Sequence, residues 1–161
     1  MMNILVVYDS KTGNTEAMAK AISEGAKRAG AQSEVKSVET VKSQDFLDSD
    51  GVIMGSPTYF GQMSSRLKHI IDDSVTVHTR LSGKVGAAFT SSGGTASGAE
   101  TTLLSIVQAM LVHGMIIQGN AEGSHYGLAV VGKPDNKDLE KCQDLGAQVA
   151  LLVQRIKSPA R

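Results

Sequence analysis

The stretch Tyr8-Asp9-Ser10-Lys11-Thr12-Gly13-Asn14-Thr15 decides the fold, because it joins an apolar run to a helical pattern. The apolar run, about Asn3–Tyr8, predicts a strand that is covered on both faces. The pattern of about Asn14–Ala29 repeats apolar residues every three or four positions and predicts a helix. A hydroxyl-rich turn before a helix is typical of a phosphate site, because free N–H groups and the helix dipole converge there. Simple helix capping would use the same residue types, so this turn alone does not establish a ligand.

The composition excludes several classes of protein. Lysine plus arginine and aspartate plus glutamate number 16 each. We therefore expect no nucleic-acid partner and no membrane-surface role, because both need a net basic face. Residues 1–15 show no signal-peptide pattern, and no apolar run is long enough for membrane insertion. The single cysteine, Cys142, allows no internal disulfide and fits a cytoplasmic protein. The length predicts one domain over residues 1–161.

Apolar patterns along the rest of the chain predict strands that alternate with helices. The segment Val41–Leu47 is interpreted as a short connector, and Pro159 ends the last helical pattern. We expect strands at about Ser33–Val38, Gly51–Gly55 and Lys84–Thr90, helices at about Ser64–Asp72, Glu100–Val112 and Asn136–Ile156, a fifth strand from Met115, and a second short strand at Leu128–Val131.

This alternation predicts an α/β fold, a three-layer αβα sandwich around a five-stranded parallel sheet. We take the strand order 2-1-3-4-5 for this sheet. Loops rich in serine, threonine and glycine follow strands 1, 3 and 4, whereas the loop after strand 2 is ordinary. In that order the three strands are neighbours, and the order reverses between strands 1 and 3. Ligands of such sheets bind beyond the carboxyl ends of the strands at the reversal. The three loops are therefore predicted to border one crevice.

The chemistry of the three loops favours one ligand. The first offers neutral donors to a phosphate. The second, Ser56–Gln62, carries Tyr59 and Phe60 in a chain with only three tyrosines, three phenylalanines and no tryptophan. Phe60 could instead be buried in a core. The third loop, Ser91–Gly98, consists of small residues whose N–H groups can approach a planar edge. A phosphate, a flat ring and backbone donors together indicate FMN.

At these positions the chain resembles the flavodoxin-like family. Its first loop is similar to the phosphate loop of that family. Within the family the chain is more similar to the WrbA-type NAD(P)H:quinone oxidoreductases. The connection that precedes Tyr126-Gly127 is shorter than those enzymes usually have. The matching stretches are Ser10-Lys11-Thr12-Gly13-Asn14-Thr15, Gly55-Ser56-Pro57-Thr58-Tyr59-Phe60-Gly61-Gln62-Met63-Ser64, Glu100-Thr101-Thr102, His113-Gly114-Met115 and Tyr126-Gly127.

The resemblance implies a set of FMN contacts and an electron donor. NAD(P)H would supply electrons, a quinone would accept them, and a homo-oligomer is compatible with the family. His113 would lie near the exposed flavin ring, on the nicotinamide or quinone side. The residues implied for FMN are Ser10, Thr12, Gly13, Asn14 and Thr15 at the phosphate, Pro57, Thr58, Tyr59, Phe60 and Gly61 beside the isoalloxazine, and Ser91, Ser92, Gly93, Gly94 and Thr95 at the pyrimidine edge and ribityl chain.

The residues leave two functions open. One is an enzyme that reduces quinone-type acceptors by two-electron transfer, and the other is a flavodoxin that carries single electrons between redox-protein partners. A low-potential carrier places acidic groups around the flavin. Residues 91–99 contain no acidic side chain, which favours the enzyme. His113 could equally cap the end of its helix. We expect no metal site, because the histidines show no ligand spacing.

Overall fold

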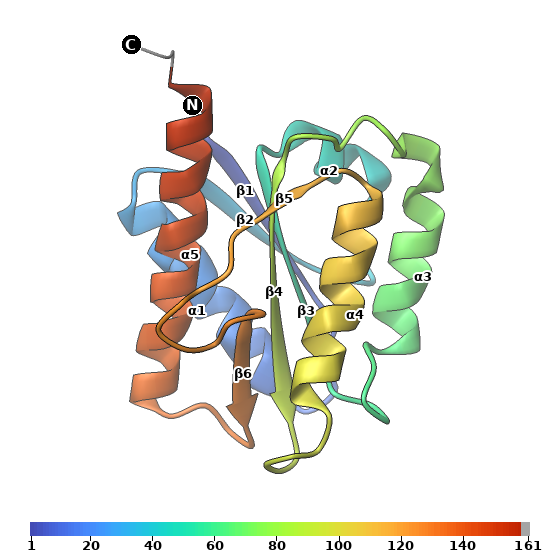
Figure 1. Cartoon of the computed structure of the whole chain (residues 1–161), viewed down its shortest axis with the longest axis vertical. Helices are drawn as coiled ribbons and strands as arrows, with labels where there is room; N and C mark the ends of the chain where they lie inside the picture. The colour runs from blue at the N-terminus through green and yellow to red at the C-terminus, as the bar shows by residue number, and fades with distance from the viewer. Residues whose placement is uncertain (159–161) are drawn as a thin grey trace.

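The centre of the computed structural model, which describes residues 1–158, is a parallel sheet of order β2-β1-β3-β4-β5 (Figure 1). This order, together with helices on both faces of the sheet, confirms the predicted αβα fold. A further strand, β6, pairs with β4 beyond the end of β5. The strands are β1 Asn3–Tyr8, β2 Gln32–Ser37, β3 Gly51–Pro57, β4 Val85–Ser92, β5 Ile116–Ile117 and β6 Leu128–Val131.

The fifth place in the sheet is shared by two short strands. β5 pairs with Val85 and Gly86 of β4, and β6 pairs with residues 89–92 of the same strand. Between them, residues 118–127 leave the sheet and return to it at Gly127. A side chain there would overlap the carbonyl oxygen of Ala88, because a Cβ atom would lie 2.3 Å from it. The expected short strand at Leu128–Val131 is confirmed as β6. Because β6 joins the sheet, the sheet has one strand more than the five predicted.

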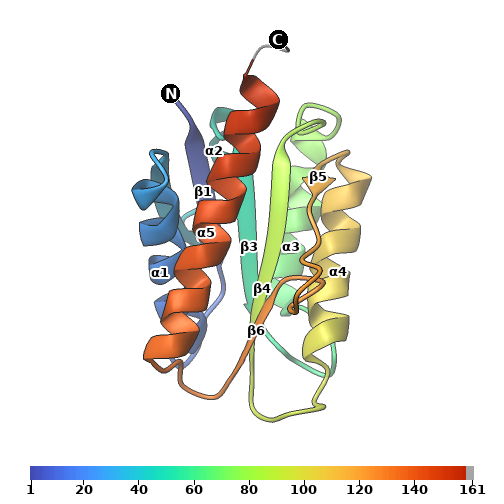
Figure 2. The same cartoon turned by 60° about the vertical axis from the view of Figure 1, so that its left-hand side comes forward.

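Helices cover both faces of the sheet, which Figure 2 shows nearly edge-on. Alternate residues of each strand point to opposite faces, so Ile4 and Val6 pack towards α1 and α5, whereas Leu5 and Val7 pack towards α2, α3 and α4. Both clusters are built from apolar side chains that are almost fully buried. The helices are α1 Asn14–Arg28, α2 Ser43–Asp48, α3 Ser65–Asp73, α4 Ala99–Val112 and α5 Asn136–Lys157, and a 3₁₀ turn covers Ser74–Val77.

The predicted connector at Val41–Leu47 is wrong, because most of it belongs to helix α2. The carboxylate of Asp45 accepts a hydrogen bond from the N–H of Lys42 at 2.8 Å, which closes the first turn. Phe46 is buried in the core of this face and holds the helix against the sheet. A six-residue helix with one large buried side chain has too little periodicity to be recognised from sequence.

The remaining boundaries agree with the predicted ones to within two residues, and Pro159 lies outside the described residues. None of the helices within residues 1–158 is both long and apolar enough to cross a membrane.

Cys142 is buried against the sheet, and this burial raises the pKa of its thiol to about 12. The thiol is therefore protonated at neutral pH and packs as a small apolar group.

Helices α1 and α5 touch through a reciprocal pair of glycines. A Cβ atom on Gly25 would lie 1.8 Å from the carbonyl oxygen of Gln143 on α5. A Cβ atom on Gly146 would lie 1.9 Å from the carbonyl oxygen of Ile22 on α1. Each helix thus packs on the bare backbone of the other, and neither carbonyl can move without distorting its helix. This close packing fixes the second half of α1 against α5.

We expect Gly146→Ala to destabilise the protein by about 3 kcal/mol, because the methyl group forces the two helix backbones apart. The better helix propensity of alanine recovers only about 1 kcal/mol of this. Urea unfolding of the variant measures the change in the free energy of unfolding. Gln148→Ala, an exposed position on the same helix, should change it by less than about 0.5 kcal/mol. An unchanged midpoint for Gly146→Ala would show that the helices do not pack this closely.

Candidate functional site

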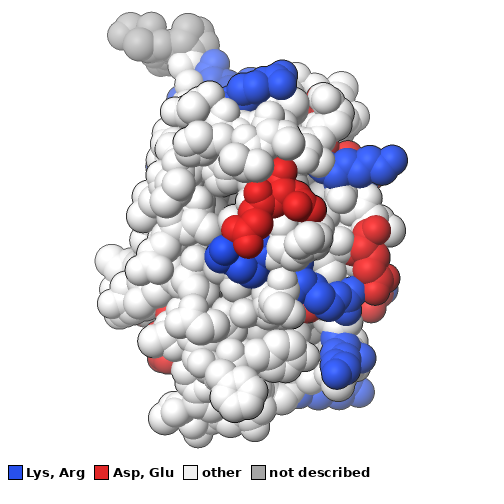
Figure 3. Space-filling model, turned by 90° about the vertical axis from the view of Figure 1, so that its right-hand side faces the viewer, with Lys and Arg blue, Asp and Glu red and all other residues white. Residues whose placement is uncertain are grey.

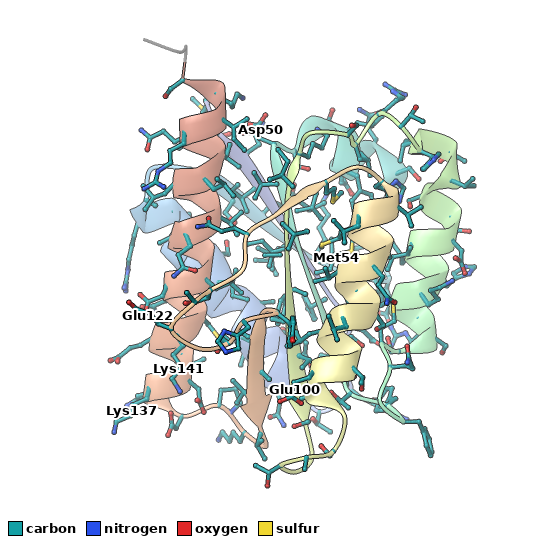
Figure 4. All side chains as sticks on the ribbon, in the orientation of Figure 1. Asp50, Met54, Glu100, Glu122, Lys137 and Lys141 are labelled. Carbon is teal, nitrogen blue, oxygen red and sulfur yellow. The ribbon has the colours of Figure 1, made fainter. Side chains whose placement is uncertain are left out.

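The three predicted loops meet at one edge of the sheet. β3 lies between β1 and β4, with Tyr8 opposite Gly55 and Pro57 opposite Ser91 near their carboxyl ends. The loops that follow these strands lie at the bottom of Figures 1 and 2, and both described ends of the chain lie at the top. In Figure 4 Glu100, at the start of α4, marks the loop edge, and Asp50 marks the opposite edge. The structure therefore brings together the three segments that the sequence assigned to one ligand.

The first loop leads directly into the N-terminus of α1. Gly13 has a φ of 92° and precedes the first helical residue, and such a positive φ favours glycine. Its N–H donates to the hydroxyl oxygen of Ser10 at 3.1 Å. Thr12 is exposed, and Asn14 is half-buried. The loop thus presents neutral donors together with the positive end of the helix dipole, which is the donor set that a phosphate monoester needs.

Hydroxyl and backbone hydrogen bonds join the start of α1 and the second loop to the carboxyl end of β4. Oγ1 of Thr15 lies 2.8 Å from Oγ of Ser91, and both side chains are buried. Oγ1 of Thr58 lies 2.9 Å from Oγ1 of Thr90. The N–H of Thr58 also donates to the carbonyl oxygen of Ser91 at 2.8 Å. These bonds hold the carboxyl ends of the three strands in register, so Thr15, which we predicted as a phosphate contact, also links the first loop to the third.

The second loop is a tight hairpin that exposes an aromatic ring. Tyr59 and Gln62 exchange two backbone hydrogen bonds of 3.1 and 3.0 Å. The two residues between them, Phe60 and Gly61, have φ values of 50° and 75°. A positive φ is strained for a bulky side chain, and such strain collects at ligand sites. The Phe60 side chain is fully exposed. The loop therefore holds a large apolar ring out in solvent beside the edge, and Phe60 is not buried in a core.

The third loop is open and lies against the second. A Cβ atom on Gly93 or Gly94 would meet no other atom within 4 Å, so both positions leave space for a ligand. Hydroxyl groups fix the loop from within, because Ser92 and Ser97 both donate to the carbonyl oxygen of Gly94. A Cβ atom on Gly98 would lie 2.6 Å from the Cα atom of Gly61. The two loops thus form one continuous rim.

His113 is the one predicted site residue that the structure does not bring to this edge. It caps the far end of α4, and its neighbour Gly114 packs on Ser82, which precedes β4. The eight residues of β4 separate it from the loops by roughly 25 Å at the usual rise per residue. The imidazole is buried, and its Nε2 atom lies 2.8 Å from the hydroxyl oxygen of Ser74.

The hydrogen bonds of Ser74 determine the state of this imidazole. The Ser74 hydroxyl donates to the carbonyl oxygen of Ile71 at 2.6 Å, so it accepts the hydrogen bond from His113. Burial lowers the pKa of His113, and so does the nearby ring of His78. The imidazole is therefore neutral at pH 7 and carries its proton on Nε2. Within a single chain, His113 caps the carboxyl end of α4 and does not reach the loop edge.

The loop edge also carries an ion cluster that sequence patterns did not reveal. The buried carboxylate of Asp9 faces the guanidinium of Arg66, with 3.1 Å between Oδ1 and Nη1. The same guanidinium binds Glu39, which follows β2. Asp9 and Glu39 come from the segments that follow β1 and β2, whereas Arg66 comes from the first turn of α3. The only signal in the sequence was the acidic residue Asp9 directly after a buried strand. The sequence around that strand does not show which basic residue lies opposite the carboxylate in the fold.

The residues present fit FMN. The first loop supplies hydroxyl, amide and backbone donors, the second supplies Tyr59 and Phe60, and the third leaves an open cradle at Gly93 and Gly94. The surface carries both signs of charge, and Figure 3 shows acidic and basic side chains interspersed on the face turned to the viewer. The nearest acidic residue after the third loop is Glu100, in the first turn of α4.

Comparison with known proteins identifies relatives over nearly the whole chain. Residues 36–127 match the family model of NADPH-dependent FMN reductases. An NAD(P)H dehydrogenase (quinone) from Archaeoglobus fulgidus is 36% identical over 97% of this chain and 100% of its own length, in an alignment of 190 residues. A flavodoxin from Aquifex aeolicus is 35% identical over 93% of this chain and 86% of its own.

A solved structure agrees with these relatives. The flavodoxin, WrbA-like protein of Agrobacterium tumefaciens superposes with a TM-score of 0.84 and is 26% identical, over 98% of this chain and 100% of its own. The fold, the three loops and the sequence identities point to the same group of proteins. The chain therefore belongs to the flavodoxin-like family, in its WrbA-type group.

Proposed function

We propose that this protein binds FMN at the loop edge and reduces quinone-type acceptors with electrons from NAD(P)H. The observation that supports this most strongly is the meeting of three ligand-type loops at the carboxyl ends of β1, β3 and β4. The match to NADPH-dependent FMN reductases and the quinone-reducing relative support the same cofactor and donor. FMN, when bound, supplies a group that takes two electrons from a nicotinamide and passes them on.

The side chains of this site bind and orient the cofactor. The donors of residues 10–15 would hold the phosphate, and Tyr59 and Phe60 would cover the flavin ring. The small third loop would place its N–H groups against the edge of the ring. We assign no general acid or base, because the reduction of a quinone by NAD(P)H takes up only one proton beyond the transferred hydride, and water can supply it. His113 is not part of the proposed site within one chain.

A flavodoxin-type carrier of single electrons is the second candidate. The observation that favours it is length, because the 190-residue alignment with the quinone-reducing relative exceeds the 161 residues of this chain. This chain therefore lacks segments which that relative has. The flavodoxin of Aquifex aeolicus aligns over 159 residues. Residues 91–99 contain no acidic side chain, which argues against a low-potential carrier. Four points stay predictions from the sequence: the quinone acceptor, a redox-protein partner, a homo-oligomer and a cytoplasmic location.

We expect Thr12→Ala to weaken FMN binding by about 1.5 kcal/mol, because it removes one hydrogen bond to a charged phosphate. Thr12 is exposed and forms no hydrogen bond within the described chain, so its loss leaves the fold intact. Titration of flavin fluorescence measures the dissociation constant. Riboflavin, which lacks the phosphate, should bind the variant as it binds the original protein, and Thr12→Ser should keep most of the FMN affinity. Equal losses for FMN and riboflavin would show that this loop does not contact the phosphate.

Anaerobic stopped-flow mixing tests the enzyme against the carrier. We expect NADPH to bleach the yellow band of the FMN-loaded protein, and a quinone added afterwards to restore it. The control is the protein without FMN, which should show no change in that band. A protein that dithionite reduces, but that both NADPH and NADH leave yellow over minutes, would be a carrier and would contradict the proposed enzyme. The measurement follows the bound flavin itself and does not depend on which quinone is physiological.

A further inference from the structure

Asp9 is a buried carboxylate directly before the first loop. It is 3% exposed, and its backbone N–H donates to the carbonyl oxygen of Gly55 on β3 at 3.0 Å. The residue is thereby fixed at the point where the strand order reverses, between β1 and β3. Its Oδ1 atom is fully enclosed and accepts no hydrogen bond of good geometry. A buried charge of this kind is costly unless an opposite charge faces it.

Arg66 supplies that opposite charge. Its Nη1 atom lies 3.1 Å from Oδ1 of Asp9, and no other ion pair to Asp9 exists within residues 1–158. Because this contact lacks hydrogen-bond geometry, the attraction is mainly Coulombic. Arg66 lies in the first turn of α3, just after the second loop, and also binds Glu39. One guanidinium therefore serves two carboxylates, one enclosed and one exposed.

This arrangement bears on the charge that the first loop can accept. The loop begins at Ser10, the residue next to Asp9, and the proposed function places a phosphate dianion on it. An unneutralised carboxylate behind the loop would repel that dianion, and the repulsion is strong where water is excluded. The guanidinium neutralises the enclosed charge of Asp9 before the phosphate arrives, whereas the exposed charge of Glu39 is screened by water and salt. The cluster is not itself an anion site, since its two carboxylates outnumber its single cation.

We propose that Arg66 determines specificity for the phosphorylated flavin by neutralising Asp9 behind the first loop. Arg66 is a positioning residue in this scheme and need not touch the cofactor. The inference rests on the proposed function, because it assumes that the loop holds the FMN phosphate. It differs from a merely structural role, in which the Asp9–Arg66 contact would hold the loop in place for any flavin.

The test compares FMN with riboflavin in a charge cycle. Flavin fluorescence titrations are carried out on the full chain, on Arg66→Gln, on Asp9→Asn and on the double variant. We expect Arg66→Gln to weaken FMN about ten-fold at low salt and riboflavin less than about two-fold, because only FMN carries the dianion. Removing the buried charge as well, in the double variant, should restore FMN affinity to within about two-fold. Raising the salt concentration should shrink the loss in Arg66→Gln.

Glu39→Gln is the matched control, because it removes the exposed partner of the same guanidinium and should leave both affinities within about two-fold. Equal losses for FMN and riboflavin in Arg66→Gln, or a double variant no better than Arg66→Gln, would overturn the inference. If Arg66→Gln does not fold, Asp9→Asn decides, since it should bind FMN at least as tightly as the original protein. Weaker FMN binding by Asp9→Asn would contradict the inference that the charge of Asp9 opposes the phosphate. An original protein that does not prefer FMN to riboflavin would instead contradict the proposed function.

Discussion

Parallel pairing of β1, β3 and β4 is the constraint on which the site depends. In a parallel sheet every strand ends at the same edge, so the loops after neighbouring strands must lie side by side. The register, with Tyr8 opposite Gly55 and Pro57 opposite Ser91, sets the heights of the three loops relative to one another. Helix α1 begins at the same edge, and its glycine contact holds its second half against α5. The fold thus places hydrogen-bond donors and the positive end of the α1 dipole together at the loop edge.

Polar groups at this edge satisfy one another and keep the loops together. The Thr15–Ser91 and Thr58–Thr90 hydroxyl pairs replace water inside the edge, which avoids the cost of buried unpaired oxygens. The hairpin at Phe60 accepts a strained backbone and exposes an apolar ring. The Asp9–Arg66 contact places a balanced charge behind the first loop. Strain, exposed apolar area and buried charge are all unfavourable in themselves, and their concentration at one edge is typical of a binding site.

Local patterns predicted most of the fold because each element is consistent with its own sequence. The continuous apolar run of β1 and the helical pattern of α5 were read correctly, and the set of ligand-type loops supported the sheet order. Helix α2 was missed because six residues around Phe46 carry too little periodicity. The Thr15–Ser91 pair, 76 residues apart, and the Asp9–Arg66 contact depend on tertiary packing. The resemblance placed His113 near the flavin, whereas α4 carries it to the opposite edge of this chain.

Amide hydrogen exchange with and without FMN tests the central claim most directly, because it reports on all three loops in one experiment. FMN should slow exchange together in residues 10–15, 57–62 and 91–98, and it should leave the edge around His113 and Ser74 unchanged. Riboflavin should slow the second and third segments and have little effect on the first. Protection of only one loop, or protection centred on the edge around His113, would show that the three loops do not form a single flavin site.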